Sequence, residues 1–74
     1  MPVELEIYGQ LADKLPRRQM IELEKGITVK EMLLRLGLQK AEIGMMVING
    51  KQVKMNDPIP ENCRLCFFPP LEGG

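Results

Sequence analysis

The chain has 74 residues, in which ten lysines and arginines balance ten acidic residues and 45% of the residues are hydrophobic. This length predicts one small domain, and the even charge balance argues against nucleic acid or an anionic membrane as a main partner. Histidine, serine and tryptophan do not occur, which excludes a serine nucleophile and a histidine base. No apolar run approaches the length of a membrane span, and the first residues do not resemble a signal peptide, so we expect a cytoplasmic protein.

The first third of the chain reads as a β-hairpin. Residues 3–8 alternate between apolar and polar side chains, which is typical of a strand with one buried face. Residues 9–17 form a polar connection in which Leu11, Ala12 and Leu15 favour a helical turn before Pro16. Residues 18–24 alternate again and are expected to pair back onto the first strand.

A short helix is expected next. Thr28 and Glu31 have the spacing of a capping box, in which the hydroxyl and the carboxylate bind the first free amides of a helix. Apolar residues then recur at helical spacing up to Leu36, and Gly37 is suited to end the helix. A helix of about nine residues is marginal alone, so it must cover a sheet.

The second half predicts another hairpin and a central strand. Asn49-Gly50 separates the apolar segments 45–48 and 51–53, and this pair favours a two-residue turn because both residues accept positive φ. A proline-containing loop covers residues 55–62, and residues 64–68 are apolar on both faces, as in a central strand beneath the helix. The fold class is therefore α+β, with one main helix packed across a mixed sheet of four to five strands.

The last residues form a tail. Pro69 and Pro70 favour extended geometry that leads away from the body, and Gly73-Gly74 offers no side chain to pack. We therefore divide the chain into a domain at residues 1–69 and an extended, flexible tail at residues 70–74. From Pro69 to Gly74 the chain can reach roughly 20 Å, enough to enter a pocket of another protein.

The element order and the closing segment from Phe67 to Gly74 resemble the MoaD/ThiS family of ubiquitin-like β-grasp sulfur carriers, with Asn49-Gly50-Lys51 in support. Within the family, the aromatic-Pro-Pro sequence and the long loop after the first strand are more similar to the small subunit of molybdopterin synthase than to the thiamine carrier. One departure is Glu61-Asn62-Cys63, where many such subunits have a Gly-Asp pair.

The resemblance implies a carrier and not an enzyme. A partner would adenylate the Gly74 carboxylate with ATP and Mg²⁺, and sulfur would displace AMP to give a thiocarboxylate that serves molybdopterin synthesis. The expected partners are this adenylating enzyme and a sulfur-accepting synthase such as the molybdopterin synthase large subunit. This chain itself is expected to bind no cofactor.

Five residues are expected to contact the partners: Phe68, Pro69, Pro70, Leu71 and Gly73. Glycines without Cβ atoms suit a narrow channel. Leu71 either caps the edge of the core or anchors the tail on a partner, and we favour the anchor because it follows two prolines. The sequence leaves open which of several further residues join a contact patch on the uncovered sheet face: Tyr8, Met20, Met45, Met46 and Met55.

Cys63 and Cys66 form a Cys-x-x-Cys sequence, which also occurs in redox and zinc sites. Three residues apart on a strand, they point to opposite faces and lie too far apart for a disulfide. A zinc site needs two more Cys or His ligands, and the chain has none, so we expect no metal site. Three alternatives to the molybdopterin carrier stay open: a thiamine thiazole sulfur carrier, a ubiquitin-like protein modifier, and a binding module without chemistry at its tail.

Overall fold

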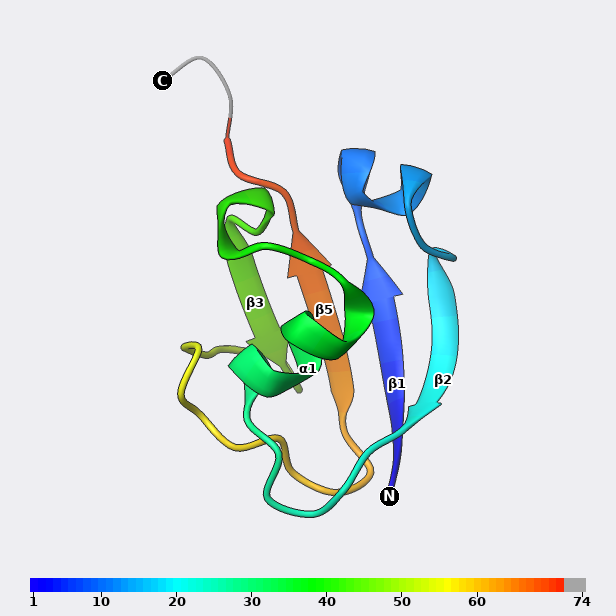
Figure 1. Ribbon diagram of the computed structural model, residues 1–74, viewed down its shortest axis with the longest axis vertical. Coiled ribbons are helices and arrows are strands. Elements are labelled where there is room, and N and C mark those ends of the chain that lie inside the picture. Colours follow the sequence, from blue (N-terminus) through cyan, green and yellow to red (C-terminus); the bar gives the residue numbers. More distant parts are fainter. Residues whose placement is uncertain (72–74) are drawn as a thin grey trace.

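The computed structural model describes residues 1–71 as a five-stranded sheet with one helix packed across it (Figure 1). The strand order is β2-β1-β5-β3-β4, in which β1 and β5 run parallel and all other neighbours run antiparallel. This confirms the α+β class. The strands are β1 (Pro2–Ile7), β2 (Arg18–Glu22), β3 (Met45–Ile48), β4 (Lys51–Gln52) and β5 (Arg64–Phe68), and the helices are α1 (Val29–Leu36) and the 3-10 turns η1 (Gly9–Asp13) and η2 (Lys40–Glu42).

The predicted N-terminal hairpin is confirmed, although β2 is shorter than expected. Val3 pairs with Ile21 and Leu5 with Gln19. The strand ends at Glu22 instead of Glu24, and Leu23 turns into the core while its N–H donates to Met1 O at 2.9 Å. The strand stops there because its partner β1 begins at Pro2, which pairs with Glu22.

Helix α1 has both ends where the sequence places them. Thr28 Oγ1 accepts from the N–H of Glu31, and the Glu31 carboxylate accepts from the N–H of Thr28, which completes the capping box. Gly37 ends the helix in the left-handed conformation, with φ 76°. The buried side of α1 consists of Val29, Met32 and Leu33.

The second hairpin is also confirmed. Asn49 and Gly50 have φ 50° and 85°, as a tight turn between antiparallel strands requires. Strand β4 has only two residues, Lys51–Gln52, and therefore ends before Val53.

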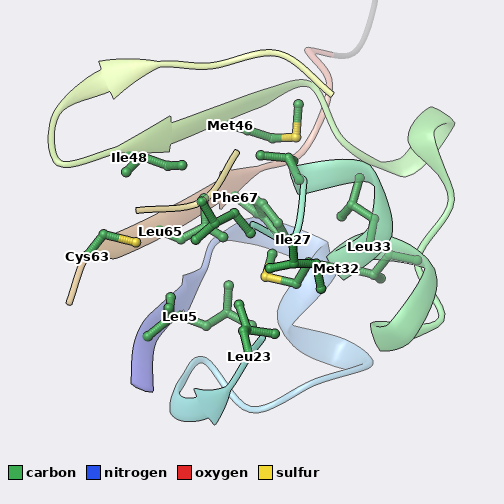
Figure 2. Packing of buried hydrophobic residues seen from close by; sticks show 14 of the residues in the cluster. Leu5, Leu23, Ile27, Met32, Leu33, Met46, Ile48, Cys63, Leu65 and Phe67 are labelled. Carbon is green, nitrogen blue, oxygen red and sulfur yellow. The ribbon is translucent and has the colours of Figure 1, made fainter. Parts of the chain in front are cut away.

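Strand β5 is the central strand, as its composition predicts. Leu65 and Phe67 are fully buried between the sheet and α1 (Figure 2). The core is a single layer formed by the inward faces of the strands, the helix and the loops at Ile27, Leu38 and Ile59. No helix covers the opposite side of the sheet within residues 1–71, and we call that side the open face.

The two 3-10 turns lie at the same end of the sheet as the end of β5 (Figure 1). Turn η1 follows β1 and buries Leu11, which matches the helical turn expected from the sequence. Turn η2 lies between α1 and β3. No helix in the described part of the chain is long and apolar enough to cross a membrane.

Candidate docking site around the C-terminal tail

The tail leaves the body at the end of β5. Phe68, Pro69 and Pro70 are half-buried, whereas Leu71 is 98% exposed. Leu71 therefore does not cap the core, and its exposure agrees with the interpretation of this residue as an anchor for a partner. Gly73 and Gly74 lie outside the described residues, so their roles stay predictions.

Pro69 and Pro70 lie directly against two glycines of the body. A Cβ atom on Gly44 would be 2.6 Å from both Pro69 O and Pro70 Cα, and a Cβ atom on Gly9 would be 2.6 Å from Pro69 Cγ. The sequence predicts two prolines that lead away from the body, and it gave no sign of this contact. The first two residues after β5 are thus in close contact with the start of η1 and with the residue before β3.

A groove beside this point extends over the neighbouring ends of β5, β3 and β4, and we call it the tail groove. Its volume is about 710 Å³. Strands β3, β4 and β5 contribute Met45, Gln52 and Phe68. The lining residues are Gly44, Met45, Gln52, Phe68, Pro69, Pro70 and Leu71. The groove therefore joins four of the five predicted contact residues, all except Gly73, to the Met45 side chain.

Phe68, Tyr8 and Met45 form an apolar patch on the open face. The Phe68 ring stacks on that of Tyr8 with centroids 4.6 Å apart and planes 4° from parallel. Met45 is the neighbour of Phe68 across the β3–β5 pair and is 38% exposed. Tyr8 and Met45 therefore join Phe68 in one surface at the tail end of the sheet.

The other methionines separate into different environments. Met46 is in the core, and Met55 is half-buried against it. Met20 is 64% exposed on β2, in register with Glu4. Only Met45 among the four lines the tail groove.

A buried carboxylate lies beside the apolar patch, which the sequence did not predict. Glu6 belongs to the polar side of β1, yet it is only 3% exposed because Tyr8, Arg64 and Arg18 surround it. Tyr8 Oη and the Arg64 guanidinium donate hydrogen bonds to it. The Tyr8 hydroxyl and the Arg64 guanidinium hold the pKa of the Glu6 carboxyl below its ordinary value, and the same bond to Glu6 raises the pKa of Tyr8.

The two cysteines lie as the strand pattern predicts. Cys63 belongs to the core, while Cys66 is half-buried on the open face in register with Glu6 and Val47. Burial raises the pKa of both thiols, so neither is an activated nucleophile. They form no disulfide. The absence of a metal site stays a prediction.

The fold and the surface around the tail define a ubiquitin-like β-grasp domain with an apolar face beside its C-terminal segment. The model of the ThiS family matches residues 5–74, and the chain belongs to this family of small sulfur carriers of the MoaD/ThiS type. The match includes the two closing glycines. None of the curated proteins matches the sequence.

Solved structures agree on the fold. SAMP1 from Haloferax volcanii has a TM-score of 0.78 at 20% identity, with 100% of each chain covered. A putative molybdopterin converting factor, subunit 1, from Pyrococcus furiosus has a TM-score of 0.77 at 15% identity, over 96% of this chain and 99% of that one. The complex of subunits 1 and 2 of molybdopterin-converting factor from Helicobacter pylori has a match with TM-score 0.67 at 19% identity, covering 100% of both chains. These similarities establish the ubiquitin-like β-grasp fold.

Proposed function

We propose that this chain is a protein co-substrate that carries sulfur on Gly74 for molybdopterin synthesis. A partner enzyme with bound ATP and Mg²⁺ joins the Gly74 carboxylate to AMP and releases pyrophosphate. A sulfur nucleophile then forms the bond to the carbonyl carbon, and AMP leaves. The resulting thiocarboxylate gives its sulfur to an acceptor bound by a synthase.

The observation that carries the proposal is the match of the ThiS family through Gly73-Gly74, together with Leu71 standing fully in solvent beside the tail groove. A carrier of this kind leaves the catalytic groups to its partners, which is consistent with a chain that has neither histidine nor serine. Phe68, Pro69, Pro70 and Leu71 form the surface that a partner contacts, and Gly73 enters the partner's channel.

The choice of acceptor rests on two features. The Phe-Phe-Pro-Pro segment before the tail resembles molybdopterin synthase small subunits, and the Helicobacter pylori relative in fold occurs in a complex with subunit 2 of the same factor. A corresponding large subunit is therefore the proposed acceptor partner. The fold shared with small archaeal modifier protein 1 of Haloferax volcanii favours one alternative, a modifier joined to proteins through Gly74. The second alternative is a sulfur carrier for thiamine thiazole synthesis.

Mass spectrometry of the intact chain tests these functions. After coexpression with an adenylating enzyme and a sulfur source, a carrier gains the mass difference between sulfur and oxygen, whereas a modifier forms conjugates of higher mass. A chain that shows neither change refutes both. Transfer of the sulfur to a molybdopterin precursor by the large subunit, and not to a thiazole synthase, then identifies the pathway.

Variants of the terminus provide the control. Deleting Gly74, or adding one residue after it, displaces the reacting carboxylate by about 3.5 Å. Pyrophosphate exchange catalysed by the adenylating enzyme should then disappear, while the melting temperature stays the same. If the extended chain exchanges at the native rate, the terminal carboxylate is not the reacting group.

A further inference from the structure

We propose that Gly9 and Gly44 form a slot that grips Pro69 and Pro70 and thereby sets the direction in which the diglycine leaves the body. We call these four residues the tail slot. The inference rests on the proposed function and deepens it, because it assigns positioning roles to residues of the body that never touch the reacting carboxylate.

The need for the slot follows from the two prolines. The backbone of β5 is held from both sides up to its last residue: the N–H of Tyr8 donates to Phe67 O at 3.0 Å, and the N–H of Gly44 donates to Phe68 O at 2.8 Å. Proline has no N–H, so Pro69 and Pro70 cannot continue the ladder as donors. From there on the body holds the chain by close packing against Pro69 and Pro70.

Gly44 is needed because a side chain would not fit there, and not because its backbone conformation requires glycine. Its φ is outside the left-handed range, so its backbone would accept any residue, but a Cβ atom would lie 2.6 Å from the backbone atoms Pro69 O and Pro70 Cα. Backbone atoms cannot swing aside as the end of a side chain can. Gly9 faces Pro69 from the other side and also has a positive φ of 64°. A glycine that begins η1 and a glycine that precedes β3 thus lie against the two prolines.

An ion pair joins η1, which carries Gly9, to η2, which precedes Gly44. Lys14 follows η1, Glu42 ends η2, and the Lys14 ammonium binds the Glu42 carboxylate. This bond lowers the pKa of the Glu42 carboxyl. Both side chains line a hollow of about 360 Å³ together with Pro70. The ion pair therefore connects η1 and η2 beside Pro70.

The direction set at Pro70 has consequences further along the chain. Gly74 is four positions beyond Pro70, and a chain of this length spans at most about 13 Å. Turning such a segment by about 15° moves its end by about 3 Å, and misplacement of a reacting group by about 1 Å can reduce a rate about a hundredfold. A docked body with a fixed exit direction leaves the last residues less space to search.

Gly44→Ala tests the slot, with Gly26→Ala as the matched control. Gly26 also has a positive φ, of 83°, but nothing lies within 4 Å of the place where its Cβ would be. Pyrophosphate exchange with the adenylating enzyme should show kcat reduced about tenfold or more in Gly44→Ala, with KM within about twofold because the open face still docks. Gly26→Ala, although strained, should retain the native kcat.

A second measurement needs no partner. The heteronuclear ¹⁵N NOE of the Leu71 amide should fall in Gly44→Ala and stay unchanged in Gly26→Ala. A folded Gly44→Ala chain with native kcat and native NOE would overturn the inference. Failure of the proposed function looks different, because the unaltered chain itself would then show no exchange, while the NOE comparison would still report on the slot.

If Gly44→Ala does not fold, Lys14 provides the test without crowding the backbone. Lys14→Met keeps most of the apolar stem and removes the charge, and it should lower both kcat and the Leu71 NOE. Lys14→Arg restores the ion pair and should restore both values. If Lys14→Met has the same kcat and Leu71 NOE as the native chain, the ion pair plays no part in holding the tail.

Discussion

Leu71 gives a test of partner contact that is free of folding effects. Its side chain is 98% exposed, so its truncation removes almost nothing from the folded domain. Replacing leucine by alanine deletes three carbon groups beyond Cβ, and burial of each in a partner pocket contributes about 0.8 kcal/mol. Leu71→Ala should therefore weaken binding by about 2.4 kcal/mol, or about fiftyfold in Kd.

The assay is titration calorimetry of the chain against the adenylating enzyme and against the acceptor subunit, with thermal melts of the same samples. Leu34→Ala is the control. Leu34 is 69% exposed on α1 and does not line the tail groove, so this substitution removes the same groups at a distance from the tail. It should leave both affinities unchanged. If Leu71→Ala binds both partners within twofold of the native chain, the tail is not anchored through this residue.

Two predictions concern the stability of the body. Thr28→Ala removes the cap of α1 and should cost about 1 kcal/mol, which lowers the melting temperature by about 4–8 °C in a domain of this size; an unchanged melt would mean that the cap contributes nothing. The second concerns Glu6. Hydrogen bonds from Tyr8 and Arg64 hold the pKa of its carboxyl in the folded chain below the ordinary value of 4.5. The ionised carboxylate therefore stabilises the fold above pH 4.5, and this stabilisation is lost as the pH falls through the folded pKa. Glu6→Gln should therefore be less stable than the native chain at pH 7, and the gap in denaturant melts should close as the pH falls below 4.5; a gap independent of pH would refute this.

The elements with local signals could be predicted from the sequence. The capping box at Thr28, the left-handed Gly37 and the Asn49-Gly50 turn each depend on residues within a few positions of one another, and all three occur as expected. The central place of β5 followed from apolar residues on both faces. Signals of this kind are strong because the chemistry of each turn restricts the residues that can form it.

The features that depend on distant residues could not be predicted. Glu6 looks like an exposed residue of an alternating strand, and its burial depends on Arg64, which is 58 positions away. Gly44 stands before β3 without any local sign that Pro69 and Pro70 will lie against it. A pattern of alternating residues gives the face of a strand, but only the sheet order shows which side chains meet on that face.

The place of β5 also determines how the domain responds to force. Strand β5 is bonded to β1 on one side and to β3 on the other, and the tail continues from its end (Figure 1). A partner that grips the tail and pulls along it loads β5 lengthwise, across hydrogen bonds that lie roughly perpendicular to the pull in the antiparallel pair and slanted in the parallel one. All of these bonds must then yield together, because none can open first as in the peeling of an edge strand. A pull along the tail therefore loads the sheet in shear, and the hydrogen bonds on both sides of β5 resist it together.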